Sequence, residues 1–144
     1  MSVIPTFQPD GTLPHGIHWA DSVEIQARFA QNPHRFQLLQ GFWQAAKELK
    51  AAGCKAVYLD GSFVTEKDMP DDYDACWDSS GVDPNKLDPV FFDFSNKRLA
   101  QKMRFRGEFF PANLTQGVGG RTFLEFFQVD KQSGDPKGII GLRL

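Results

Sequence analysis

The residues of this sequence best suited to chemistry are a Gly-Ser step, Gly61-Ser62, and two aspartates, Asp72 and Asp74. Nine residues separate Ser62 from Asp72. If residues 72–77 form a β-strand, both carboxylates point to one face, roughly 6.5–7 Å apart along the chain. Two hard oxygen ligands on one rigid face can bind Mg²⁺, and a divalent ion organises phosphates. The spacing therefore predicts a metal and phosphate site.

A long helix and two strands are expected to position these residues. Apolar side chains recur at helical spacing over residues 32–52, with an Asn-Pro start and Gly53 as the stop. Residues 54–60 are typical of a short buried strand, so the Gly-Ser step leaves that strand directly. Residues 72–78 are the next strand candidate, and the aspartates lie near its start.

The remaining elements predict an α+β domain with a mixed sheet flanked by helices. We expect one domain over residues 1–144, with residues 1–20 as an irregular N-terminal arm rich in Pro and Gly. A C-terminal β-hairpin is expected from a Phe-rich strand and its partner after a turn. The other expected elements are helices at 22–30 and 95–104, a strand at 90–94, an irregular segment at 107–120, and hairpin strands at 122–128 and 138–144.

Composition limits the class of protein. The chain has 144 residues, 14 of them Phe, which suits one domain with an aromatic core. Its net charge is −2, so no global basic signature of a nucleic-acid binder is present and no DNA partner is expected. Cys54 and Cys76 form neither a disulfide framework nor a zinc site and are expected to be buried thiols. Without a signal peptide or a run of ~20 apolar residues, we expect a cytoplasmic protein with no membrane partner.

The pattern Gly61-Ser62-x9-Asp72-x-Asp74, after an apolar strand and a long helix, resembles the nucleotidyltransferase superfamily, which has the DNA polymerase β-like fold. The resemblance covers roughly residues 34–94. Its minimal single-domain members include the nucleotidyltransferase halves of bacterial toxin–antitoxin pairs. The whole chain, including residues 60–65 and 123–128, also resembles a family of small uncharacterised bacterial proteins.

The superfamily resemblance implies a role for each residue of the pattern. Gly61 and Ser62 would contact the triphosphate of a nucleotide, because glycine lets the backbone approach closely and serine donates an O–H. Asp72 and Asp74 would bind two Mg²⁺ ions. The ordinary alternatives are a plain turn for the Gly-Ser step and a solvated strand end for the aspartates, since Asp71-Asp72 after a proline is common turn composition.

The superfamily usually supplies a third carboxylate from a neighbouring strand, and Asp93 is the first candidate. It interrupts an apolar run, and a buried carboxylate is costly unless it is paired or binds a metal. It could instead face solvent or cap the next helix. Glu125 is the rival, between Leu124 and Phe126.

A basic segment follows Asp93 and could bind the triphosphate or an RNA backbone. A charged helix face is also commonly just solvated. Its cations are Lys97, Arg98, Lys102, Arg104 and Arg106.

These features together predict a Mg²⁺-dependent nucleotidyltransferase that moves a nucleoside monophosphate from an NTP, with ATP expected, to a protein or RNA hydroxyl. Its short length favours a protein partner, as in a toxin–antitoxin pair. The alternative is a non-catalytic protein of the same fold, an antitoxin or adaptor that masks a partner. A third hypothesis is that the motif is accidental and the domain is an unrelated α+β fold.

Overall fold

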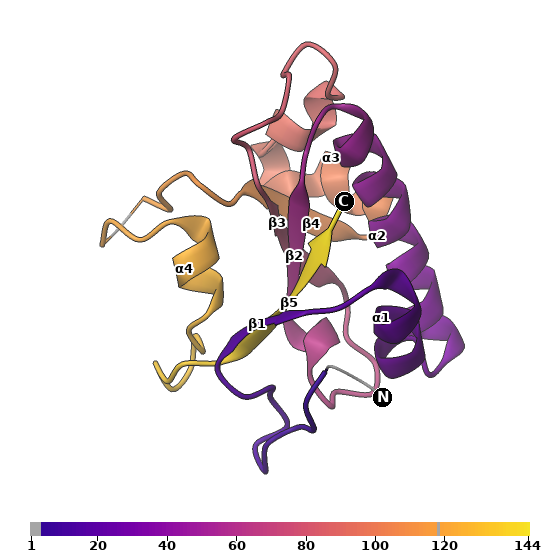
Figure 1. Cartoon of the computed structure of the whole chain (residues 1–144), viewed down its shortest axis with the longest axis vertical. Helices are drawn as coiled ribbons and strands as arrows, with labels where there is room; N and C mark the ends of the chain where they lie inside the picture. Colours follow the sequence, from indigo (N-terminus) through magenta and orange to yellow (C-terminus); the bar gives the residue numbers. More distant parts are fainter. Residues whose placement is uncertain (1–3, 118) are drawn as a thin grey trace.

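Five strands form one sheet at the centre of the molecule. A computed structural model describes residues 4–117 and 119–144. The strand order is β1-β5-β2-β3-β4, so the last strand lies between the first and the second (Figure 1). The strands are β1 (Gly16–Trp19), β2 (Ala56–Asp60), β3 (Tyr73–Trp77), β4 (Gly107–Pro111) and β5 (Gly138–Arg143).

The sheet is mixed. Strand β2 runs antiparallel to both of its neighbours, β3 and β5, while β1 pairs with β5 and β4 with β3 in parallel. Helices cover both faces, which confirms the predicted α+β class with a mixed sheet and flanking helices. The helices are α1 (Ser22–Phe29), α2 (Pro33–Ala51), α3 (Ser95–Phe105) and α4 (Phe123–Phe127).

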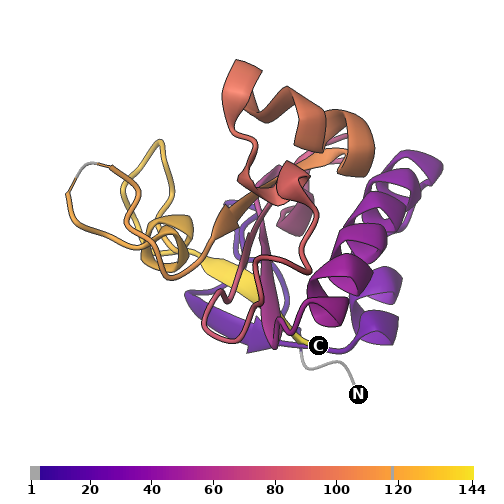
Figure 2. The same ribbon diagram turned by 90° about the horizontal axis from the view of Figure 1, so that it is seen from above.

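Alternation along the strands divides the buried side chains into two cores. One face carries Val57, Leu59 and Tyr73, which pack in the larger core with α1, α2 and α3. The opposite face carries Tyr58 and Cys76, which pack with the Phe-rich helix α4. The two views agree that α1 and α2 lie on one side of the sheet and α4 on the other (Figure 2). Both cysteines are buried free thiols, as expected.

The expected long helix is confirmed, and its start is well defined. Asn32 accepts a hydrogen bond from the Arg35 backbone N–H at 2.8 Å, and Pro33 occupies the first helical turn. The strand predicted after Gly53 is also confirmed as β2, with all five of its residues buried. The next predicted strand is confirmed as β3.

The predicted C-terminal β-hairpin is wrong, because its first strand is helix α4. Thr122 and Glu125 form a capping box, in which each side chain binds the backbone N–H of the other residue. The strand preference of aromatic residues depends on their packing context, and here they pack from a helix against a sheet face. The hairpin partner is a strand, β5, but it pairs with β1 and β2.

Three other expectations also need correction. The strand predicted at 90–94 is instead the 3-10 helix Pro89–Phe92, started by a proline. The segment 107–120, expected to be irregular, begins with β4; its residue 118 lies outside the described residues. The predicted N-terminal arm ends in strand β1, and its residues 1–3 also lie outside the described residues.

Helix α3 was expected, but it contains an unusual turn. Asn96, Lys97 and Arg98 have left-handed backbone angles, with φ of 51°, 55° and 63°. Such angles are unfavourable for residues other than glycine.

Candidate functional site

The Gly-Ser turn follows the central strand β2 and packs against Asp74. Gly61 has φ of 86°, and the 3-10 helix Ser62–Val64 comes next. A Cβ atom at position 61 would lie 3.1 Å from both the backbone nitrogen and Oδ2 of Asp74. Glycine is therefore required at position 61 both for its backbone angle and for this close contact. The turn and the second aspartate of the motif form one unit.

Three carboxylates lie side by side across three neighbouring strands. Asp60 on β2 is opposite Asp74 on β3, and Asp74 is opposite Glu108 on β4. Directly paired residues in a sheet point to the same face with their Cβ atoms about 5 Å apart. We call Asp60, Asp74 and Glu108 the acidic row.

Asp74 and Glu108 are joined by a hydrogen bond between their carboxyl groups. Burial, that hydrogen bond and the nearby charges of Glu108 and Asp60 raise the pKa of Asp74 to about 7. Burial opposes ionisation of Glu108, but the hydrogen bonds from Asp74, Lys102 and Arg98 outweigh it and lower the pKa of Glu108. Below about pH 7, Asp74 is thus the protonated donor, and Glu108 is the carboxylate acceptor.

Asp72 lies just before β3, and its pKa also depends on the charge of Glu108. Burial and the charge of Glu108 raise the pKa of Asp72, and Lys102 opposes the shift. Asp74 lies within β3 and points away from the core residue Tyr73. Asp72 precedes the strand and lines a different hollow, with residues of α2 and α3. Both aspartates of the motif are nonetheless close enough to Glu108 to interact with its charge.

Four cations surround these carboxylates. Lys137 binds the buried Asp60 at 2.8 Å, while Arg98 and Lys102 each bind Glu108 at 3.1 Å. Burial raises the pKa of both Asp60 and Asp74, and the charge of Lys131 opposes these two shifts. The site thus combines concentrated negative charge with cations from α3 and from the segment before β5.

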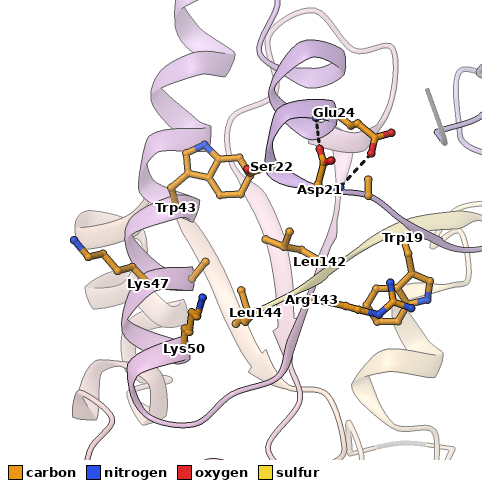
Figure 3. A pocket seen from close by; sticks show the side chains of 12 residues that line it. Trp19, Asp21, Ser22, Glu24, Trp43, Lys47, Lys50, Leu142, Arg143 and Leu144 are labelled. Atoms are coloured by element: carbon orange, nitrogen blue, oxygen red, sulfur yellow. Dashed lines mark hydrogen bonds between the residues drawn. The ribbon is translucent and has the colours of Figure 1, made fainter. Parts of the chain in front are cut away.

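A cleft of about 490 Å³ opens over the Gly-Ser turn. Gly61, Ser62 and Asp74 line it together with Lys67 and Lys131. A larger hollow of about 600 Å³ lies elsewhere, between α1, α2 and the end of β5 (Figure 3). That hollow includes no residue of the motif. We place the candidate site in the smaller cleft because Asp60 and Asp74, two buried carboxyl groups with raised pKa values, line it.

Arg35 holds the loop that leaves the Gly-Ser turn. Its side chain projects from α2, is 2% exposed, and donates hydrogen bonds to the carbonyls of Phe29, Phe63, Thr65 and Lys67. Its guanidinium also lies 5.1 Å from the centre of the Phe63 ring. Sequence reasoning missed this arginine, because a single cation on a helix is usually solvated.

The structure does not bring Asp93 or Glu125 to the motif. Asp93 ends a 3-10 helix and accepts hydrogen bonds from the Ser95 backbone N–H and hydroxyl, which lower its pKa. Glu125 caps α4, and its hydrogen bonds with Thr122 lower its pKa. In the part of the chain that the structure describes, neither one contacts Asp72 or Asp74.

Glu108 takes the position beside Asp74 that the sequence assigned to Asp93. Sequence reasoning missed it because the segment after Arg106 was expected to be irregular. The structure buries Gly107, Phe109 and Pro111 and leaves Glu108 half-buried between Gly107 and Phe109. The two successive phenylalanines hide this alternation in the sequence. Within residues 4–117 and 119–144, no three His, Cys, Asp or Glu side chains are placed to hold a metal ion as they stand.

Comparison with known proteins identifies a family. The model of a family of unknown function, DUF6932, matches residues 5–143. The chain belongs to this family. No curated protein and no solved structure matches the chain. No helix among the described residues is long and apolar enough to cross a membrane.

The raised pKa of Asp74 predicts how stability depends on pH. In the presence of EDTA, folded Asp74 keeps its proton up to about pH 7, whereas an unfolded aspartate loses it near 3.9. The folded state therefore binds more protons in that window, and the free energy of unfolding should fall as pH rises from about 4 to about 7. Asp74→Asn should make this fall shallower in urea titrations. An unchanged slope would contradict a proton held by Asp74 in its hydrogen bond to Glu108.

Proposed function

We propose that the chain is a Mg²⁺-dependent nucleotidyltransferase with a DNA polymerase β-like site. The observation that carries the proposal is the contact between the Gly61-Ser62 turn and Asp74, with Glu108 beside Asp74 on the next strand. A plain turn would not need an aspartate packed beneath its glycine. The reaction moves a nucleoside monophosphate from an NTP, with ATP as the first to test, to a hydroxyl.

The cleft supports the binding of a triphosphate. Gly61 lines the cleft without a side chain that would fill it, and the Ser62 hydroxyl can donate a hydrogen bond to a phosphate oxygen. Lys67 and Lys131 line the same cleft, and ammonium groups suit phosphate oxygens. Lys137 is held by Asp60 and contributes to the same wall.

The acidic residues fit a Mg²⁺ ion chemically. Carboxylate oxygens are the hard donors that Mg²⁺ prefers, and two of these carboxyl groups already share a hydrogen bond. Asp72 and Asp74 would hold the ion, with Glu108 in place of Asp93 as the third carboxylate. When bound, Mg²⁺ would neutralise charge on the triphosphate and make the attacking hydroxyl more acidic.

The transfer itself follows from positioning. The acceptor oxygen attacks the α-phosphorus and forms a new P–O bond, while the bond from that phosphorus to the bridging oxygen breaks. Pyrophosphate leaves with the electron pair, and the hydroxyl proton passes to solvent through the carboxylates. The chain contributes orientation and charge, the main sources of catalysis in phosphoryl transfer.

Binding of Mg²⁺ with a non-hydrolysable ATP analogue should raise the melting temperature of the wild type. Asp72→Ala and Asp74→Ala should lose most of this rise, because each removes a carboxylate that would hold the metal. Glu108→Gln should weaken the rise, whereas Asp93→Ala should keep it, since Asp93 ends a 3-10 helix and its carboxylate is bound by Ser95. Each is measured by differential scanning fluorimetry.

Two outcomes would count against the enzyme. If no NTP shifts the wild type, or if the two aspartate variants respond as the wild type does, the nucleotide site is wrong. If Asp93→Ala abolishes the shift and Glu108→Gln does not, the third carboxylate is Asp93.

A non-catalytic binding protein is the second candidate, and one observation favours it. Glu108 is already held by Arg98 and Lys102 at 3.1 Å, so the chain's own cations occupy the third carboxylate. Leu99 and Met103 on the same helix are 48% and 77% exposed, which suits a protein partner such as the other half of a toxin–antitoxin pair. Nucleotide binding without pyrophosphate release on any acceptor would favour this candidate.

A further inference from the structure

A continuous groove runs between α1 and α2. It consists of the hollow of about 600 Å³ described above and a neighbouring hollow of about 670 Å³, and Ser22 and Trp43 line both of them. In Figure 3, Trp43, Lys47 and Lys50 follow one another along α2 beside the first hollow. The lining of this groove has no residue in common with the cleft over the Gly-Ser turn. The groove is therefore a separate surface.

One half of the groove is apolar and is built from one face of each helix. The residues of α1 that line it include positions 23, 26, 27 and 30, which share one helix face. Phe36 and Trp43 line it from α2, two helical turns apart. Val23 and Phe36 are 75% and 43% exposed. Neighbouring exposed apolar side chains of this kind mark interaction surfaces.

The other half of the groove has a basic rim. Lys47 and Lys50 continue the line of Trp43 along α2, and both are exposed. Within the described residues neither lysine makes an ion pair. Arg143, at the end of β5, adds a third cation and rests 4.1 Å over the ring of Trp19.

Two carboxylates also line the basic half, but both cap α1. Asp21 accepts a hydrogen bond from the Glu24 backbone N–H at 2.8 Å, and the Glu24 side chain binds the Asp21 backbone N–H to complete the capping box. Three cations thus share this end with two carboxylates that already bind backbone groups. Among the described residues, those that line the apolar half carry no charge. The groove therefore has excess positive charge at one end only.

We propose that this groove binds an amphipathic helix of a partner protein. Apolar side chains of that helix lie between α1 and α2, and acidic residues at one of its ends face Lys47 and Lys50. The proposal is independent of the nucleotidyltransferase activity, since the groove and the candidate site share no lining residue.

The shape of the groove favours a helix over an extended peptide. Side-chain ridges of one helix pack into the grooves between those of its neighbours, and a hydrophobic groove receives anchors spaced i, i+3, i+4 and i+7. A helix satisfies its backbone hydrogen bonds internally, whereas an extended chain would place unpaired N–H and C=O groups against the apolar half. From Phe36 to Lys50 the groove follows about four turns of α2, roughly 21 Å, which sets the length of the partner helix.

A second copy of this chain does not match the charges. If two grooves faced each other in antiparallel directions, Lys47 and Lys50 of each copy would meet the uncharged apolar half of the other. If the grooves ran in parallel, the lysines of the two copies would meet and repel one another. Complementary charge must therefore come from a different chain.

The test uses two fluorescein-labelled synthetic peptides of about four helical turns, measured by anisotropy with the full chain. Both carry leucines at the spacing of one helix face. One ends in three glutamates, and its twin has three lysines in their place. A helix can lie in the groove in either direction, so the acidic end can be at either terminus. The wild type should bind the glutamate peptide about tenfold more tightly than the lysine peptide.

Three variants locate the binding surface. Val23→Glu should weaken binding of the glutamate peptide about tenfold, because it places an unpaired charge in the apolar half. It also adds an acidic residue to the first turn of α1, which favours the helix. Met103→Glu is the matched control, since Met103 is 77% exposed on α3, and should change binding by less than about twofold.

The double variant Lys47→Glu/Lys50→Glu should reverse the preference and bind the lysine peptide more tightly. A general loss of structure would weaken both peptides and would not exchange their order. Melting curves of all variants verify that they fold.

Several results would overturn the inference. These are no binding of the glutamate peptide to the wild type, equal binding of the twin peptides, or a preference that the double variant does not reverse. Loss with Met103→Glu in place of Val23→Glu would move the partner to α3. A wild-type dimer that Val23→Glu dissociates, measured by sedimentation, would make a second copy the occupant. Binding to phosphatidylcholine–phosphatidylserine vesicles that Val23→Glu abolishes would assign the groove to a membrane surface.

Discussion

Replacing Arg35 with methionine should lower the free energy of unfolding by about 3–5 kcal/mol. The Arg35 guanidinium is almost fully buried and donates to four carbonyls. Three of them follow the Gly-Ser turn: Phe63 at 2.7 Å, Thr65 at 2.9 Å, and Lys67. Methionine fills part of the space but leaves those carbonyls without donors. An unsatisfied buried polar group costs about 1–3 kcal/mol, so the summed loss is large.

Urea unfolding at neutral pH measures this effect. Arg143→Met is the matched control, because Arg143 is exposed and rests 4.1 Å over the Trp19 ring without a buried hydrogen bond. That control should lose less than about 1 kcal/mol. Arg35→Lys should fall between the two, since an ammonium cannot reach four carbonyls at once. A loss under 1 kcal/mol for Arg35→Met would show that the loop is held by other contacts.

The second large effect is expected at Gly41, in the middle of α2. Alanine normally stabilises a helix interior by about 1 kcal/mol relative to glycine. Here a Cβ would lie 1.9 Å from the carbonyl oxygen of Phe105, so α2 and α3 would have to separate. Gly41→Ala should therefore destabilise the protein by roughly 1–3 kcal/mol, the range for overpacking. The sign is opposite to that given by helix propensity.

The same contact connects Gly41 to the candidate site. The Phe105 carbonyl that approaches Gly41 also accepts a hydrogen bond from the Tyr73 hydroxyl at 2.8 Å, and Arg106 follows it. Gln44→Ala, at an exposed position of α2, is the control and should change stability by less than about 0.5 kcal/mol. A more stable Gly41→Ala protein would mean that α2 and α3 lie farther apart than described.

The elements that were predicted correctly carry strong local signals. Helix α2 has an N-cap asparagine, a proline in its first turn and a sustained helical pattern, so its bounds follow from the sequence. Strand β2 is a continuous apolar run bounded by glycines. These two elements place the Gly-Ser step, and the first half of the candidate site was therefore accessible from sequence.

The second half of the candidate site, the placement of Glu108 beside Asp74, depends on contacts between segments far apart in the sequence. Strand β4 forms because it pairs with β3 in parallel, about 34 residues earlier, and no local pattern requires it. That pairing brings Glu108 to Asp74. The helix α4 had a local signal in its capping box, Thr122 and Glu125, but the aromatic run outweighed it in the prediction. Glu125 was therefore considered for a strand that does not exist.

The position of β5 has a consequence for how the protein is made. Strand β5 inserts between β1 and β2, although it comes last in the sequence. During synthesis on the ribosome, the edge of β2 that will pair with β5 has no partner until residues 138–143 have emerged. Until then Val57 and Leu59 also lack part of their core, because β5 contributes Ile140 and Leu142 to it. Open strand edges readily pair with other chains. A nascent chain stalled before β5 is therefore a natural substrate for chaperones.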